Sequence, residues 1–263
     1  MTAALPPKKK PRLALPSLDS SFFSSPSQTG VSTSAATVAA GLREGQRQRS
    51  SPHVVGQFPS LVYVPVPADA AASLLEASER YLTTVSSSDV LGGRPFVPLA
   101  ADGLHVSLSR DFMLFRDTLD PFCDALEGSV RGVREFSYAV DTGRPRLLVN
   151  DAGTRLFLAF GVCEGGARFI SLVREAVDPV LERFGAAERY YDECDVHVSV
   201  ASVVPCRPID SEALSELRQT LQTTVETEGT DQETHEDHIL HVRATKVLCK
   251  RGDRCFVVKL VPN

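Results

Sequence analysis

Two short segments of this sequence share one pattern, Leu104-His-Val-Ser-Leu108 and Val196-His-Val-Ser-Val200. In each, apolar residues alternate with His and Ser, which predicts a strand with one face in the core and with His and Ser side by side on the other. Chance alone would give about 0.07 His-Val-Ser triplets in such a chain. The fold must therefore bring together two equivalent strands, one from each half of the chain.

Helices and strands alternate along the rest of the sequence, with several strands joined by short turns. Apolar periodicity, proline and glycine positions predict strands at 61–66, 135–140, 146–149, 155–160, 241–248 and 256–260, and helices at 68–82, 120–130, 167–184 (bent at Pro179) and 211–224. This order favours an α+β fold over a parallel doubly wound sheet. We expect two pseudo-symmetric lobes of antiparallel sheet plus helices, with a central active-site groove.

The first 50 residues differ in composition from the remainder. They are rich in Ser, Pro, Ala and Thr without apolar periodicity, so residues 1–50 are expected to be a disordered tail and residues 51–263 the folded domain. The tail contains Pro7-Lys-Lys-Lys-Pro-Arg12, which is either a nuclear-localisation cluster or a solvated charge run. The first interpretation predicts a nuclear protein.

Charge and composition exclude several classes. The formal net charge of −5 argues against a protein that grips long nucleic acids through a broad basic surface, although it allows an enzyme that holds one or two nucleotides. No stretch of bilayer length is free of charges and prolines, so no membrane association is expected. The sequence also lacks a phosphate-binding loop, a dinucleotide fingerprint and a nucleophile elbow.

The paired motifs suit cleavage of an RNA phosphodiester. One imidazole would take the proton from the ribose 2′-hydroxyl as it attacks phosphorus, and the other would protonate the departing 5′-oxygen. The two serines would donate to the nonbridging oxygens, so no metal or cofactor is required. The alternative is that each His and Ser only satisfy one another on a half-buried strand. His235-Glu-Asp-His238, followed by His241, has metal-ligand residues, but we interpret it as a solvated loop.

HVSLSR and HVSVA resemble the paired signatures of the 2H phosphoesterase superfamily. Over residues 53–262 the chain is similar to the U6 snRNA 3′-end phosphodiesterase family, in LHVSLSRDFMLFRDTLDPF, NDAGTR, FISLVREAVDPVLERF, YYDECDVHVSVA and KVLCKRGDRCFVVKL. The resemblance implies the bilobal 2H fold. It also implies a 3′-to-5′ RNA exonuclease that trims the U-rich end of U6 snRNA by transesterification, leaving a 2′,3′-cyclic phosphate or a 3′-phosphate.

The same resemblance assigns roles to individual residues. His105 and His197 would be the acid–base pair, with His105 taken as the base although the roles exchange if a cyclic product is later opened. Ser107 and Ser199 would hold the phosphate. The remaining assignments concern the terminal nucleotide, which would contact Tyr191, the backbone at Asp195 and Val196, and Asp151, which stands where relatives carry a polar residue.

Two other functions remain open from the sequence. The chain could be a cyclic phosphodiesterase or 2′-5′ RNA ligase-like enzyme, or a noncatalytic RNA-binding module that keeps the same groove. The favoured partner is the single-stranded 3′ end of an RNA, bound by a monomer.

Overall fold

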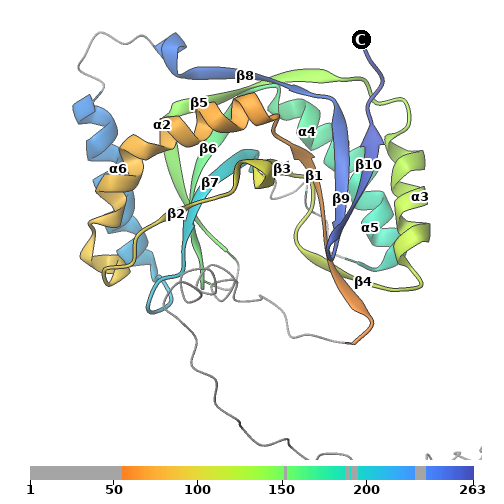
Figure 1. Cartoon of the computed structure of the whole chain (residues 1–263), viewed down its shortest axis with the longest axis horizontal. Coiled ribbons are helices and arrows are strands. Elements are labelled where there is room, and N and C mark those ends of the chain that lie inside the picture. Colours follow the sequence, from red (N-terminus) through yellow and green to blue (C-terminus); the bar gives the residue numbers. More distant parts are fainter. Residues whose placement is uncertain (1–54, 151–152, 187–189, 191–194, 229–234) are drawn as a thin grey trace, which may run out of the picture. The chain divides into compact units, whose positions relative to one another are not determined.

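The computed structural model describes residues 55–263 apart from 151–152, 187–189, 191–194 and 229–234 (Figure 1). These residues fall within one compact unit, Arg49–Asn263. The expected tail at residues 1–50 and its basic cluster lie outside the described residues. Among the helices that the structure describes, each is too short or too polar to cross a bilayer.

In chain order the elements are β1 (Gln57–Pro65), α2 (Ala68–Ser86), η2 (Asp89–Leu91), β2 (Val97–Pro98), η3 (Ala101–Gly103), β3 (His105–Ser107), β4 (Phe112–Phe115), α3 (Leu119–Val130), β5 (Phe136–Val149), β6 (Leu156–Glu164), α4 (Gly166–Leu172), the π-helical turn η4 (Val173–Val177), α5 (Asp178–Phe184), β7 (His197–Val203), α6 (Ser211–Glu228), η6 (His235–His238), β8 (Ile239–Ala244), β9 (Lys246–Arg251) and β10 (Arg254–Lys259).

The strands form two sheets. Sheet A has the order β10-β9-β1-β3, with β4 also pairing to β1, and sheet B has the order β2-β7-β6-β5-β8. Every pairing between these named strands is antiparallel. The predicted α+β class with antiparallel sheets is therefore confirmed. Each sheet contributes one His-x-Ser strand, β3 in sheet A and β7 in sheet B.

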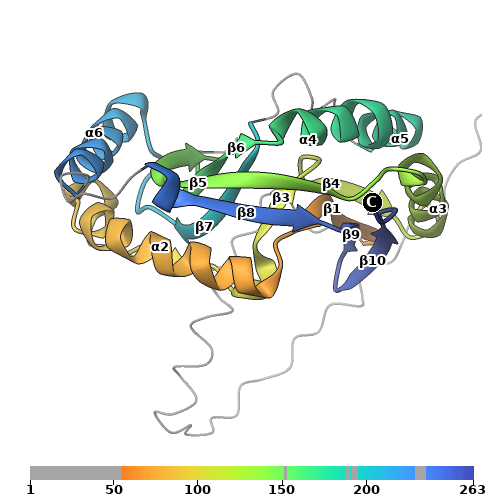
Figure 2. The same cartoon turned by 90° about the horizontal axis from the view of Figure 1, so that it is seen from above.

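Helices pack against both sheets (Figures 1 and 2). Helices α2 and α6 contact each other, and α2 also contacts β5 and β7 of sheet B. Helix α3 contacts α5, the turn η4 and β10 of sheet A. The motif strands β3 and β7 themselves lie side by side, so the two sheets meet at the strands that carry the histidines.

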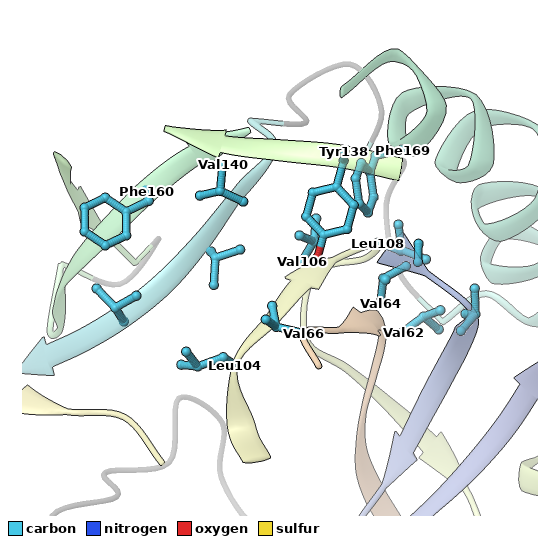
Figure 3. Close-up of a cluster of buried hydrophobic side chains, with 14 of the residues drawn as sticks. Val62, Val64, Val66, Leu104, Val106, Leu108, Tyr138, Val140, Phe160 and Phe169 are labelled. Atoms are coloured by element: carbon cyan, nitrogen blue, oxygen red, sulfur yellow. The ribbon is translucent and has the colours of Figure 1, made fainter. Parts of the chain in front are cut away.

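Alternation in β1 and β3 fixes which side chains reach solvent. Val62 and Val64 of β1 and Val106 of β3 are buried, and Figure 3 shows them clustered with Tyr138 and Phe169. Burying an apolar side chain of this size contributes about 1.5–3 kcal/mol. Because successive residues of a strand point to opposite faces, the burial of Val106 turns His105 and Ser107 away from the core.

Two expected strand boundaries differ from the structure. The expected strands 135–140 and 146–149 are one strand, β5, whose register against β6 shifts between Asp141 and Pro145. The expected strand 241–248 is two strands, because β8 belongs to sheet B and β9 to sheet A. Its buried positions change from even numbers, ending at Ala244, to odd numbers, starting at Val247. That change of parity marks the crossing between the sheets.

The long helix expected at 167–184 is interrupted by a π-helical turn, which is wider than an α-helical turn. Helix α4 runs into the π-helical turn Val173–Val177 and continues as α5, whose first turn holds Pro179. A proline inside a helix lacks an N–H donor and its ring crowds the carbonyl four residues earlier. A wider turn just upstream relieves this crowding. The irregularity in the helix therefore begins before Pro179, where the sequence placed the bend.

Candidate active site

The two motif strands present their polar residues in the same way. His105 and Ser107 are half-buried on either side of buried Val106, and His197 and Ser199 are half-buried on either side of buried Val198. Two imidazoles and two hydroxyls thus come from adjacent strands of different sheets. A charge on His197 would lower the pKa of His105, so the two imidazoles interact electrostatically.

Both imidazoles are held by the same hydrogen bond. His105 Nδ1 lies 2.6 Å from the carbonyl oxygen of Gly103, and His197 Nδ1 lies 2.6 Å from the carbonyl oxygen of Asp195. A carbonyl oxygen only accepts, so Nδ1 carries the proton and donates in each ring. The neutral ring then offers a lone pair at Nε2, and the protonated ring offers an N–H there. Either histidine can therefore exchange a proton with a substrate through Nε2.

The surroundings of His105 favour its neutral form. Burial lowers the pKa of His105 below its usual value of 6.5, and the charges of His197 and Lys250 lower this pKa further. The hydrogen bond to Gly103 and the carboxylate of Asp111 act in the opposite direction. A histidine that is neutral near pH 7 can accept a proton, which suits a general base.

Tyr63 of β1 also supports His105. The two ring centroids are 4.8 Å apart at an interplanar angle of 53°. Tyr63 is the register partner of Ser107, and its hydroxyl lies 3.7 Å from Cys255 Sγ. Burial and the neighbouring thiol raise the pKa of Tyr63, so the phenol keeps its proton. The tyrosine therefore supplies a neutral aromatic wall that limits rotation of the His105 ring.

An ion pair between Asp195 and Arg146 holds the backbone carbonyl that binds His197. Asp195, whose carbonyl binds His197, pairs its carboxylate with Arg146 of β5 at 2.7 Å. The Arg146 guanidinium reaches Asp195 across Gly161 of β6, the register partner of His197. A Cβ at Gly161 would lie 2.7 Å from Arg146 Nη2. Both charged side chains are about half exposed, so the pair adds little stability, about 0–1 kcal/mol, and serves orientation instead.

Of the residues predicted to contact the terminal nucleotide, some lie within the described part of the chain and others do not. Asp195 is exposed next to His197, with its carbonyl and its carboxylate both engaged. Tyr191 and Asp151 lie outside the described residues.

The His235–His238 segment is a 3-10 turn, and its His238 ring lies against Gly143 of β5. Within the described ranges, no group of three or more His, Cys, Asp or Glu side chains is arranged to hold a metal ion.

Three residues that act on the two motif histidines were not predicted from the sequence. Tyr63, Arg146 and Lys250 act on the histidines through strand pairing or through space, and no local motif marks them. A glycine inside the apolar strand 156–164 was the one available signal, because an interior strand glycine often marks a close approach by another group. At Gly161 that group is the Arg146 side chain.

The two antiparallel sheets, each with one His-x-Ser strand at their junction, identify the fold as that of the 2H phosphoesterases. A family model described as HVSL, an uncharacterised conserved protein, matches residues 16–259, and the chain belongs to this family. The structure of Usb1 from Kluyveromyces marxianus superposes with a TM-score of 0.56 at 18% identity, covering 80% of this chain and 100% of that one. The same protein with uridine monophosphate gives a TM-score of 0.54 over 78% of this chain and 97% of that one.

Curated relatives are similar over most of their length. The protein named U6 snRNA phosphodiesterase 1 from Bos taurus is 28% identical over 231 residues, which is 87% of this chain and 79% of that protein. The protein of the same name from Homo sapiens is 29% identical over 222 residues, which is 83% of this chain and 75% of that protein.

Proposed function

We propose that this protein is a 3′-to-5′ RNA phosphodiesterase that trims the U-rich 3′ end of U6 small nuclear RNA in the nucleus, acting as a monomer. One observation carries the chemistry: two histidines on adjacent strands of different sheets hold their Nδ1 protons on backbone carbonyls and leave Nε2 for the substrate. The relatives named U6 snRNA phosphodiesterase 1 support the choice of RNA. The Usb1 structure that holds uridine monophosphate supports a uridine at the site.

The reaction is a transesterification. Neutral His105 accepts the proton from the 2′-hydroxyl of the penultimate nucleotide at Nε2, and the 2′-oxygen forms a bond to phosphorus. The bond from phosphorus to the 5′-oxygen of the terminal nucleotide breaks, and protonated His197 donates to that oxygen from Nε2. The shortened RNA then ends in a 2′,3′-cyclic phosphate. No proton step in this scheme calls for a metal ion.

The two serines stabilise charge in the same step. Ser107 and Ser199 each lie two residues after a histidine, on the same face of the strand. Their hydroxyls donate to the nonbridging phosphoryl oxygens as negative charge grows there. On this scheme Tyr191, Asp151 and the backbone at Asp195 contact the terminal nucleotide, with Tyr191 stacking on its base.

A short-substrate assay tests the proposal. The protein is incubated in EDTA with an oligo-uridine RNA or with a copy whose penultimate residue is 2′-deoxy. Mass spectrometry then identifies the length and the 3′ end of each product. The expected result is that the protein shortens only the all-ribose RNA, one nucleotide at a time, and leaves a cyclic phosphate at its end. The variants His105→Ala and His197→Ala should have no activity on either RNA.

Other outcomes point elsewhere. Cleavage of the deoxy substrate, or cleavage only with added metal, contradicts transesterification by two histidines. Turnover of small cyclic phosphates alone indicates the cyclic phosphodiesterase or ligase-like function. RNA binding without any turnover, unchanged when both histidines are removed, indicates a binding module.

A further inference from the structure

We propose that the open face of sheet A binds the RNA strand on the 5′ side of the scissile linkage, with Lys246, Lys250 and Lys259 contacting its phosphates. This inference rests on the proposed function. It adds a path for the body of the RNA, which neither the catalytic groups nor the terminal-nucleotide positions provide.

Strand register defines the open face. Directly paired residues of antiparallel strands project to the same side of a sheet. Ser107 pairs with Tyr63, Tyr63 with Leu248, and Leu248 with Val257, so one row crosses all four strands from β3 to β10. None of these side chains is buried, and Val257 is 49% exposed. The row therefore begins at Ser107, the proposed phosphate-binding serine of β3, and continues across the solvent-facing side of the sheet.

Lysines flank this apolar row on both sides. Lys246 and Lys259 are register partners of each other, two residues along their strands from Leu248 and Val257. Lys250 lies two residues beyond Leu248 in the other direction, opposite Cys255. All three lysines are exposed, and the charge of Lys250 reaches His105. An apolar strip between ammonium groups matches single-stranded RNA, whose bases offer flat apolar faces and whose phosphates are anionic.

The strands of sheet A carry no acidic side chain. None of the five contains Asp or Glu, although the whole chain has a formal net charge of −5, and the acidic residues Asp111 and Asp253 lie in the segments that join these strands. Sheet B, by contrast, includes Asp141 and Glu164. By strand alternation Arg251 and its register partner Arg254 project to the opposite face, where Arg251 pairs with Asp120 at 2.6 Å, so the three lysines are the cations that these strands place on the open face. The open face of sheet A thus presents three lysines and no acidic side chain from its own strands, although the whole chain has a net negative charge.

The direction of the RNA follows from the role of His105. The nucleotide that gives up its 2′-proton lies on the 5′ side of the scissile phosphate, so it must sit at the general base. His105 belongs to sheet A, and His197, next to the leaving nucleotide, belongs to sheet B. From β3 to β10 is about 14 Å, given three strand spacings of about 4.8 Å. Lys259 therefore contacts a nucleotide further upstream than the scissile pair.

A binding measurement tests the path without relying on turnover. The probe is a ten-nucleotide oligo-uridine with a 2′-deoxy penultimate residue and a 5′ fluorophore, and its Kd is measured by anisotropy at several salt concentrations. The charge reversal Lys246→Glu/Lys259→Glu is expected to raise Kd roughly tenfold and to reduce the salt slope by about 0.7 for each lost phosphate contact. The matched control Arg168→Glu/Arg174→Glu changes the net charge equally on exposed positions of α4 and η4, and its Kd should stay within about twofold of wild type.

Activity provides a second readout. The ratio of kcat/KM for the ten-nucleotide RNA to kcat/KM for the dinucleotide UpU is expected to fall roughly tenfold in the lysine variant, since only the longer RNA crosses the open face. Equal effects of the lysine and arginine variants on Kd and on this ratio would overturn the path. If wild-type protein binds the probe through the lysines but cleaves neither substrate, the proposed function fails and the path stands.

Discussion

At the scale of single residues, the site depends on differences between two similar histidines. His105 and His197 share the same backbone hydrogen bond, but their neighbours differ: an aromatic ring and a lysine charge for His105, and an ion-paired aspartate for His197. Burial, together with the charge of Lys250, favours the neutral form of His105 that the proposed base requires. The proposed division of roles therefore rests on the surroundings of the two histidines, because the motif is the same in both strands.

The pH dependence of activity should reveal the influence of Lys250. The proposed mechanism requires neutral His105, so kcat/KM for UpU should fall as the pH drops through the pKa of His105, which lies below 6.5. Lys250→Gln removes a charge that lowers this pKa, so the acidic limb should move to higher pH. Lys246→Gln, on the same strand but not among the groups acting on His105, should leave the limb in place. An unmoved limb in Lys250→Gln would contradict this assignment.

Tyr138 places a hydroxyl group in the core. Its hydroxyl is buried without a hydrogen-bond partner among the described residues, while its ring packs against Phe169 at 5.0 Å. Tyr138→Phe keeps the ring contact and should raise the free energy of unfolding by about 1 kcal/mol, measured by urea denaturation. Tyr81→Phe is the control, because the Tyr81 hydroxyl donates to Thr142 O at 3.1 Å and its removal should cost about 1 kcal/mol. A destabilised Tyr138→Phe would show that the hydroxyl is satisfied in solution.

At the scale of elements, strands β5, β6 and β7 act as one support for His197. Arg146 on β5 crosses Gly161 on β6 to pair with Asp195, which lies two residues before the start of β7 and holds the histidine ring through its carbonyl oxygen. The support requires the missing side chain at Gly161. Beyond the register shift in β5, Arg146 pairs with Ala159, which lies two residues before Gly161 and on the same face of β6.

The substitution Gly161→Ala tests this support. The new methyl group should displace the flexible end of Arg146 and lower kcat/KM for UpU roughly tenfold to hundredfold by misplacing His197. The unfolding midpoint should change little, because the guanidinium can move toward solvent. In an Arg146→Ala background the same substitution should cause no further loss of activity, because the group that it displaces is already absent. Additive losses would mean that Gly161 acts independently of Arg146.

At the scale of the whole molecule, the sequence predicted what depends on local pattern. The alternation around His105 and His197 was sufficient to predict both strands and the orientation of their side chains. Thr245, where the chain leaves sheet B for sheet A, was missed although a change of parity marks it. Tyr63 and Arg146 could not be predicted, because their contacts depend on strand register between segments more than forty residues apart in sequence.

In the proposed mechanism the two sheets hold the two halves of the substrate. Sheet A, whose strands contain no acidic residue, would provide the base, and sheet B would provide the acid beside the leaving nucleotide. The pairing of one histidine from each sheet is the central claim, because it makes catalysis a property of the interface between β3 and β7.

Substitution of the leaving group tests that claim most directly. A UpU analogue with sulfur in place of the bridging 5′-oxygen has a leaving group that departs as a thiolate and needs no proton. We predict that His197→Ala, inactive on UpU, cleaves this analogue at close to the wild-type rate, whereas His105→Ala remains inactive on both. Rescue of His105→Ala, or failure to rescue either variant, would contradict the assignment of a base on sheet A and an acid on sheet B.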